Sequence, residues 1–231
     1  MIKKIIILFL FSLSVSQIGN AQEAESLITA VNKKFSLVSD YKAKVLMKFA
    51  LPGIRINTLS GKVFYKRPNK FRIRAKGIFF VPKDNPIKDI PKLLANTKSY
   101  TSVITGYATV EGQRCAVVNV IPLDPNLELI IGKFWIRVKD PLIYLSEITT
   151  KENGTIRTQN FYGNYNKYAL PDKILIQIEM KKFKVPKLLA MDVKKKSKSK
   201  SVSKKSTGEI YMLMSDYKIN SKLPNSVFTE K

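Results

Sequence analysis

The sequence contains no histidine and only one cysteine in 231 residues. The absence of histidine removes the commonest general base, the usual partner of serine and cysteine nucleophiles, and the commonest metal ligand. The single cysteine, Cys115, excludes an internal disulfide framework and a cysteine-rich metal site. We expect Cys115 to be a small apolar residue within a strand.

Other features of catalytic sites are also missing. The sequence has no glycine-rich phosphate-binding loop, and its 17 acidic residues are scattered without a close pair that would suggest acid–base chemistry. The composition therefore favours a binding protein, without metal or cofactor, over an enzyme.

The first 21 residues have the layout of a secretory signal peptide. Two lysines at positions 3 and 4 precede an apolar run over residues 5–15, which only two serines interrupt, and small residues follow at Gly19 and Ala21. The run is about half of the roughly 20 apolar residues that a spanning helix needs, which disfavours an uncleaved membrane anchor. No cysteine stands near the cleavage site to carry a lipid. We expect cleavage near Ala21 and a periplasmic, monomeric domain over residues 22–231 that is not lipid-anchored.

Acidic residues are few compared with basic ones. The chain carries 41 Lys and Arg against 17 Asp and Glu, a net charge of +24, and residues 1–21 account for only two of these charges. Such an excess predicts an acidic partner, either nucleic acid or an anionic lipid surface. Export favours the lipid surface, and the basic segments lack the interleaved aromatics that nucleic-acid binding requires.

One segment concentrates this charge. Residues 181–205 contain eleven lysines and one acid, Asp192, and the second half is almost entirely Lys and Ser. That composition predicts a disordered excursion over about 192–207. It is interpreted either as a solvated loop without a partner or as a membrane-docking element through Lys194, Lys195, Lys196, Lys198 and Lys200.

Hydrophobic periodicity predicts one helix followed by many strands. Over Glu23–Ser39, apolar residues recur at helical spacing in a single stripe, made by Leu27, Val31, Phe35 and Val38. The period then changes to two, and turn signals separate the segments. The predicted strands are Lys42–Phe49, Thr58–Lys66, Phe71–Ala75, Tyr100–Val110, Arg114–Ile121, Phe134–Val138, Leu142–Thr150, Thr155–Tyr165, Lys173–Met180 and Gly208–Tyr217.

The pattern describes an antiparallel sheet with one apolar face, too wide for one helix to cover. Such a sheet is expected to curl around whatever it shelters. The proline-rich residues 81–96 interrupt the meander and predict a loop with one helical turn.

The segment Leu59–Arg72 resembles the signature strand pair of the LolA family of periplasmic lipoprotein carriers and its LolA-like relatives. The matching residues are Gly61, Lys66, Arg67, Pro68, Asn69 and Phe71. The late Asn153-Gly154 hairpin and Leu223–Phe228, which is similar to the closing segment of that family, extend the resemblance. The sequence departs from the family pattern at residues 81–96, where an Asp-Gly turn and a tryptophan-containing strand are usual, and the single tryptophan lies at position 135.

The resemblance implies a mainly β fold, an open, curved antiparallel half-barrel with an N-terminal helix and short lid helices. It implies that Arg67 latches the lid and that Phe71 lies beside it, whereas the residues alone are equally compatible with a basic hairpin turn and a core phenylalanine. The apolar face would line a cavity for acyl chains of a lipoprotein or phospholipid. The predicted lining residues are Val45, Met47, Phe49, Phe64, Ile73, Phe134, Ile136, Ile176 and Ile178.

Two functions fit this expectation. The first is a periplasmic carrier that shelters lipid or lipoprotein acyl chains for transfer towards the outer membrane, contacting an anionic membrane or a membrane-bound donor or acceptor. The second is a LolA-like sensor or interaction domain, which binds a membrane or envelope partner without carrying cargo.

Overall fold

The computed structural model describes residues 21–52, 56–68, 70–75, 78–80, 90–152, 154–179 and 207–229. Within these ranges a helix over residues 21–36 precedes one eleven-stranded antiparallel sheet. The strands are β1 Asp40–Ala50, β2 Leu59–Lys66, β3 Lys70–Ala75, β4 Ile78–Phe80, β5 Tyr100–Val110, β6 Gln113–Pro122, β7 Leu129–Arg137, β8 Ile143–Thr150, β9 Gly154–Phe161, β10 Lys173–Glu179 and β11 Thr207–Ile219. The short helices are α2 Ile90–Ala95, η1 Thr97–Ser99, η2 Asn166–Tyr168 and η3 Asn225–Val227.

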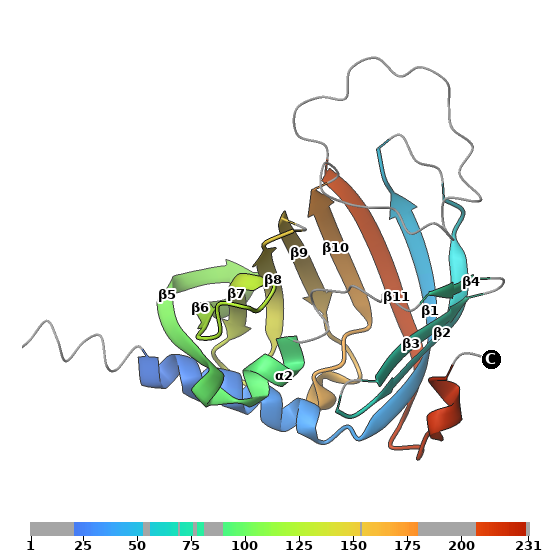
Figure 1. The fold of residues 1–231 in the computed structure, drawn as a ribbon, viewed down its shortest axis with the longest axis horizontal. Coiled ribbons are helices and arrows are strands. Elements are labelled where there is room, and N and C mark those ends of the chain that lie inside the picture. Colours follow the sequence, from blue (N-terminus) through green and yellow to red (C-terminus); the bar gives the residue numbers. More distant parts are fainter. Residues whose placement is uncertain are drawn as a thin grey trace, which may run out of the picture.

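The strand order is β4-β3-β2-β1-β11-β10-β9-β8-β7-β6-β5. Two meanders, β1 to β4 and β5 to β11, are therefore joined where the first strand pairs with the last. The sheet curves around α2, and the N-terminal helix runs along the same side below β5 to β8 (Figure 1). We call the face against which these helices pack the inner face, and the opposite one the outer face.

Period-two alternation decides which side chains reach the inner face. On β1, Ala43, Val45 and Met47 are buried on the inner face, while Lys44 and Lys48 are exposed on the outer face. The pairing register carries this inner face across every strand from β3 to β5, because directly paired residues share a face.

The N-terminal helix and α2 form one apolar core with the inner face of β5 to β8. Leu27, Ile28 and Val31 of the helix are each at least 92% buried, and burial of such a side chain contributes about 1.5–3 kcal/mol. The Asn32 side-chain amide donates to the Leu94 carbonyl of α2 at 2.6 Å. The two helices are thus fixed to each other as well as to the sheet.

A second, smaller core lies on the outer face of β6 and β7. It contains Cys115, Val117 and Trp135 together with Leu142 and Tyr144. The prediction that Cys115 is a buried strand residue is confirmed. Both faces of this part of the sheet are therefore packed.

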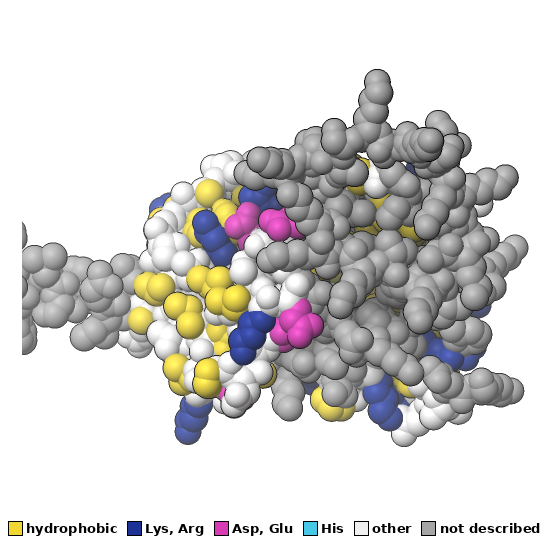
Figure 2. Space-filling view, turned by 45° about the horizontal axis from the view of Figure 1, so that its top comes forward, with side chains coloured by type: hydrophobic (Ala, Val, Ile, Leu, Met, Phe, Trp, Pro, Cys, Tyr) yellow, Lys and Arg dark blue, Asp and Glu magenta, His cyan; other side chains and the backbone are white. Residues whose placement is uncertain are grey.

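Exposed apolar side chains gather at the end of the molecule formed by β5 to β7 (Figure 2). On β5, β6 and β7, Tyr107, Ile121 and Ile130 respectively are about half exposed, and Leu123, which follows β6, is 61% exposed.

The predicted mainly β fold, an open curved antiparallel sheet behind an N-terminal helix, is confirmed. All ten predicted strands are present, and the helical turn expected before residue 96 is α2. Residues 1–20, 81–89 and 180–206 lie outside the described residues, so the signal peptide and the lysine-rich excursion stay predictions.

Several elements differ from the prediction. Strand β7 begins at Leu129, before the predicted Phe134. The helix ends at residue 36 rather than Ser39, because Leu37 and Val38 donate to the carbonyls of Lys34 and Phe35 in a tightened last turn. Strand β9 ends at Phe161 instead of Tyr165, since residues 162–169 form a turn that contains η2. Strand β4 was not predicted, because three residues are too few to show alternation.

Candidate functional site

Among the described residues, the N-terminal helix and α2 pack over one half of the inner face, β5 to β8, and the helix reaches the other half through Phe35 near its end. Over β5 to β8, Phe134 and Ile136 are 3% and 1% exposed and lie in the core made with the N-terminal helix and α2. Both residues face inward on the sheet, and their role as cavity lining stays a prediction. They are covered core residues in this structure, so the surface that could receive a ligand lies elsewhere on the sheet.

The other half of the inner face carries an apolar patch of half-buried side chains. It spans β10, β11, β1 and β2, where inner-face residues pair directly across neighbouring strands: Ile176 with Ile210, Ile210 with Phe49, and Met212 with Met47. We call this surface the apolar patch. Its half-buried members are Phe49, Leu59, Ile174, Ile176, Ile210 and Met212.

Buried residues support this patch from the same face. Val45, Met47 and Ile178 on its strands, and Ile73 on the neighbouring β3, are each at least 93% buried. The structure therefore brings Val45, Met47, Phe49, Ile73, Ile176 and Ile178 of the predicted cavity residues onto one surface.

Phe64 corrects the prediction, because it lies on the outer face. It pairs with Lys42 and Arg72, and the Arg74 guanidinium lies 5.7 Å from its ring centroid. The three consecutive apolar residues Val63, Phe64 and Tyr65 do not reveal which of them point inward. The pairing of Val63 with Ala43 fixes the face, and a shift of one residue reverses every side chain.

An aromatic cluster closes one end of the apolar patch. Tyr41 contacts both Tyr65 and Tyr217 at ring-centroid distances of 5.4 Å, Phe35 contacts Tyr65 at 5.3 Å, and Tyr165 contacts Tyr217 at 4.7 Å. Burial raises the pKa of Tyr41 and Tyr217 well above that of a free tyrosine, so both phenols are neutral. Tyr217 donates to the Pro171 carbonyl at 2.7 Å, which satisfies its hydroxyl.

No protein-family model and no curated protein matches the sequence. Solved structures do match the fold. A LolA superfamily protein from Nitrosomonas europaea superposes with a TM-score of 0.58 at 12% identity, covering 90% of this chain and 97% of the other. A domain named for outer membrane lipoprotein sorting from Vibrio parahaemolyticus gives 0.55 at 11% identity, covering 89% and 97%.

This chain has the LolA-like fold. A DUF1329 family protein from Desulfovibrio piger agrees, with a TM-score of 0.57 at 10% identity and coverage of 91% and 98%. The identities are low, so these likenesses establish the architecture, while residue roles rest on the contacts of this chain.

Within the LolA-like fold, Arg67 and Phe71 lie at the hairpin that joins β2 and β3. Arg67 is exposed, and its backbone N–H donates to the Ser39 carbonyl at 3.0 Å. Phe71 pairs with Tyr65 on the inner face and is 36% exposed. Burial raises the pKa of Tyr65, and the nearby Arg67 partly offsets this. Since α2 packs over β5 to β8, a latch between Arg67 and a lid stays a proposal.

The remaining basic residues of this hairpin have a role that the sequence did not reveal. The Lys66 ammonium donates to the Leu223 carbonyl at 2.6 Å, and Lys70 donates to the Asn225 side-chain oxygen at 3.0 Å. Arg72, 2% exposed, donates through one guanidinium nitrogen to the carbonyls of Val227 and Thr229 at 2.8 and 2.6 Å. These three residues fix the C-terminal segment, residues 223–229, to the outer face of β2 and β3.

This contact joins the basic hairpin between β2 and β3 to the closing segment Leu223–Phe228, which are far apart in the sequence. The basic hairpin and Leu223–Phe228 both contributed to the resemblance, and their contact is the physical reason for them to occur together. The available signal was the alternation of Lys66, Lys70 and Arg72, which places all three on one face.

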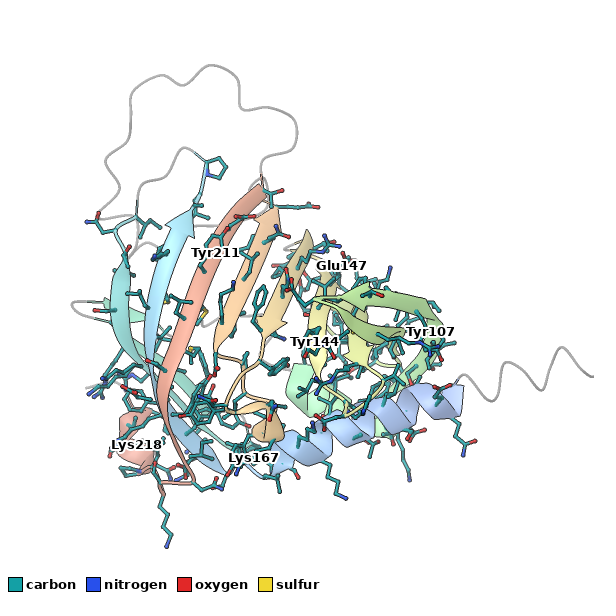
Figure 3. All side chains as sticks on the ribbon, turned by 180° about the vertical axis from the view of Figure 1, so that it is seen from behind. Tyr107, Tyr144, Glu147, Lys167, Tyr211 and Lys218 are labelled. Atoms are coloured by element: carbon teal, nitrogen blue, oxygen red, sulfur yellow. The ribbon has the colours of Figure 1, made fainter. Side chains whose placement is uncertain are left out.

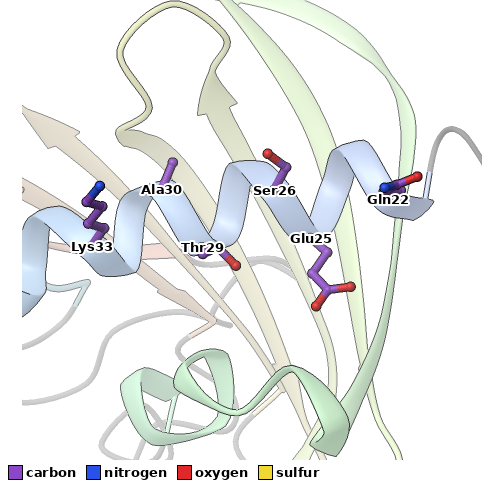
Figure 4. Close-up of a pocket in the computed structure, with 6 residues that line it drawn as sticks. All are labelled: Gln22, Glu25, Ser26, Thr29, Ala30 and Lys33. Carbon is purple, nitrogen blue, oxygen red and sulfur yellow. The ribbon is translucent and has the colours of Figure 1, made fainter.

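A hollow lies along the N-terminal helix, away from the apolar patch. It is open, has a volume of about 530 Å³, and is lined by residues of that helix alone: Gln22, Glu25, Ser26, Thr29, Ala30 and Lys33 (Figure 4). It opens along an exposed helix surface, and five of its six lining residues have polar side chains, which does not suit the enclosure of an acyl chain.

Within the described ranges, no helix has the length and apolarity to cross a membrane. The same residues contain no group of three or more acidic or cysteine side chains arranged to hold a metal ion.

Proposed function

We propose that this protein is a periplasmic carrier that shelters the acyl chains of a lipid or lipoprotein on its inner face for transfer towards the outer membrane. The observation that supports this proposal is the apolar patch over β10, β11, β1 and β2. The protein would act as a monomer, without catalysis and without a cofactor.

The energetics explain why a concave apolar surface suits this task. Each methylene exposed to water costs about 0.8 kcal/mol, so two or three chains of about 16 carbons represent roughly 25–40 kcal/mol. A curved sheet can enclose such chains, whereas a flat surface leaves much of each chain in water.

The composition of the patch favours release as well as binding. Met212 and Met47, which are paired on neighbouring strands, provide unbranched side chains that adapt to irregular ligands, and the isoleucines around them are only half buried. Such an adaptable surface binds acyl chains of different kinds with moderate affinity. An acceptor membrane or protein can therefore remove them.

The direct experiment is to express the full chain, to purify its cleaved, mature form from the envelope, and to extract that form for lipid mass spectrometry. Bound diacylglyceryl or phospholipid species, and transfer of a lipidated substrate from membranes, are the expected results. An empty protein that transfers nothing would contradict the carrier and favour the sensor or interaction domain.

A paired substitution tests the patch itself. Ile176 on the inner face and Leu175 on the outer face are adjacent, half-buried residues of β10. Ile176→Asp places a charge where acyl chains would lie, so it should abolish lipid retention, while Leu175→Asp should retain lipid. Equal lipid content in the two variants, both shown to be folded by circular dichroism, would exclude the apolar patch as the binding surface.

The latch is tested at Arg67. Arg67→Leu should change the rate of lipid uptake or release and leave the melting temperature nearly unchanged, because the side chain is exposed. Loss of folding without a selective effect on lipid would instead assign Arg67 to the hairpin turn.

A further inference from the structure

The outer face of β3, β2, β1 and β11 is strongly basic. These four strands contain nine Lys and Arg residues and three acids. Three of the basic residues fix the C-terminal segment, and the other six project from the outer face. We call these six the basic face: Lys42, Lys44, Lys48, Lys62, Arg74 and Lys218.

Like charges are placed directly opposite each other across this face. Lys44 pairs with Lys62, and Lys62 pairs with Arg74, so three cations form a row over three neighbouring strands. Like charges directly opposite on paired strands destabilise a sheet. A row of this kind therefore lowers stability to the extent that anions do not compensate for it.

Of the three acids on the same strands, one forms an ion pair with a residue of the basic face. Asp216 forms an ion pair with Lys44 at 2.6 Å. Asp40 accepts hydrogen bonds from Ser221, and Glu209 accepts them from Gln177 and Tyr211. Lys48, Lys62 and Lys218 are exposed. Within the described part of the chain, none of the three forms an ion pair.

Apolar side chains lie between the lysines. Leu213 of β11 is 39% exposed and pairs with Leu46 of β1, between the level of Lys44 and that of Lys48. Tyr211 and Lys218 lie toward opposite ends of β11 (Figure 3), so the strand brings aromatic, apolar and basic groups to one surface. Basic residues that surround apolar ones are typical of surfaces that bind a lipid interface.

We infer that the basic face is a docking surface for an anionic lipid membrane. Cations distributed over four strands match the many dispersed headgroups of such a membrane, whereas a specific protein partner usually offers a few deep anchor points. This surface is distinct from the lysine-rich excursion, and it is on the opposite side of the strands that carry the apolar patch.

The test compares two double variants of the full mature chain with the same net charge. Lys48→Glu with Lys62→Glu alters the basic face, and Lys33→Glu with Lys98→Glu alters exposed lysines on the N-terminal helix and η1. The probe is vesicles of phosphatidylcholine containing phosphatidylglycerol, free of lipoprotein, at low salt. The first variant should bind about thirtyfold more weakly or worse, and the control should change little.

A stability measurement separates docking from damage to the fold. Lys62→Glu alone places an acid between Lys44 and Arg74, so it should keep or raise the melting temperature while it weakens vesicle binding. Equal loss in both double variants, equal binding to vesicles without phosphatidylglycerol, or undiminished binding by Lys62→Glu would each overturn the inference. Because the vesicles carry no cargo, this result is independent of the lipid-retention experiment.

Discussion

Asp140 connects a turn of the sheet to the N-terminal helix. It lies between β7 and β8 in the left-handed region, with φ at 59°, and forms ion pairs with Lys34 of the helix and with Arg137 at 2.6 Å. The hydrogen bond from Lys34 lowers the pKa of this carboxyl more than burial raises it, and Arg137 adds to the lowering. The carboxylate thus stabilises the folded state above its unfolded pKa.

Asp140→Asn should show this contribution directly. Asparagine tolerates the same backbone conformation, and because Asp140 is 56% exposed the loss near neutral pH should be only about 0.5–1 kcal/mol. The difference from the wild type should disappear as the pH falls through the lowered pKa, since protonation removes the same charge. Urea unfolding at neutral and acidic pH measures both values, and a difference that persists in acid would contradict this explanation.

Cys115 illustrates how burial determines the reactivity of a single residue. Its thiol is 0% exposed, and its sulfur lies 3.5 Å from the Gln113 carbonyl. Burial raises the pKa of the Cys115 thiol, and the charge of Arg137 offsets this only in part. The nucleophilic thiolate is therefore scarce at neutral pH.

Native protein should react with iodoacetamide much more slowly than urea-unfolded protein. Mass spectrometry of the alkylated cysteine over time provides the measurement. Alkylation of the native chain at the rate of a free thiol would mean that β6 opens readily.

At the scale of elements, the C-terminal segment depends on buried Arg72. In the folded protein its guanidinium donates to two carbonyl oxygens in place of water. Hydrogen bonds to charged groups contribute about 1.5–3 kcal/mol each. The Lys66 and Lys70 contacts extend the attachment along the hairpin.

Arg72→Met should reduce the free energy of unfolding by about 2–4 kcal/mol and release residues 223–229. Carboxypeptidase should then remove these residues from the folded variant much faster than from the wild type. Arg74→Met, which changes an exposed neighbour on β3, is the matched control and should protect the segment normally. Equal digestion of the two variants would refute the role of Arg72.

The sequence predicts a strand and its buried face reliably where apolar and polar residues alternate. Alternation in β1 and β10 determines both the strand and its face, because polar residues stand at most of the outer positions, with Leu46 and Leu175 as the exceptions. In β2 the run from Val63 to Tyr65 leaves the face undetermined, which explains the error at Phe64. Coverage of Phe134 and Ile136 depends on where distant helices pack, and periodicity within β7 contains no information about that.

At the scale of the whole molecule, charge is distributed between a folded surface and a segment of low complexity. The net charge is +24, and residues 181–205 contribute ten of these charges. The basic hairpin was predicted as a functional motif, whereas the basic face was not, because it depends on pairing between β1, β2, β3 and β11.

Deletion of Lys194–Lys205 should leave the melting temperature nearly unchanged, since a Lys/Ser segment is expected to bury little apolar surface. It should weaken binding to anionic vesicles at low salt, and the difference should shrink as salt screens the charges. Co-sedimentation across a salt series measures both effects. Binding identical to that of the intact chain would assign the segment to the solvated loop.

The pairing of β1 with β11 also has a consequence for synthesis. Ser221 donates to Asp40 from 181 residues away, and the central strand pair joins the two ends of the described chain. A ribosome releases Asp40 long before Ser221, so the middle of the sheet forms last, after almost the entire polypeptide has emerged. Such non-local closure is slow. A chain that completes its sheet this late stays partly unfolded during most of its translation, which is the state that the export predicted from residues 1–21 would require.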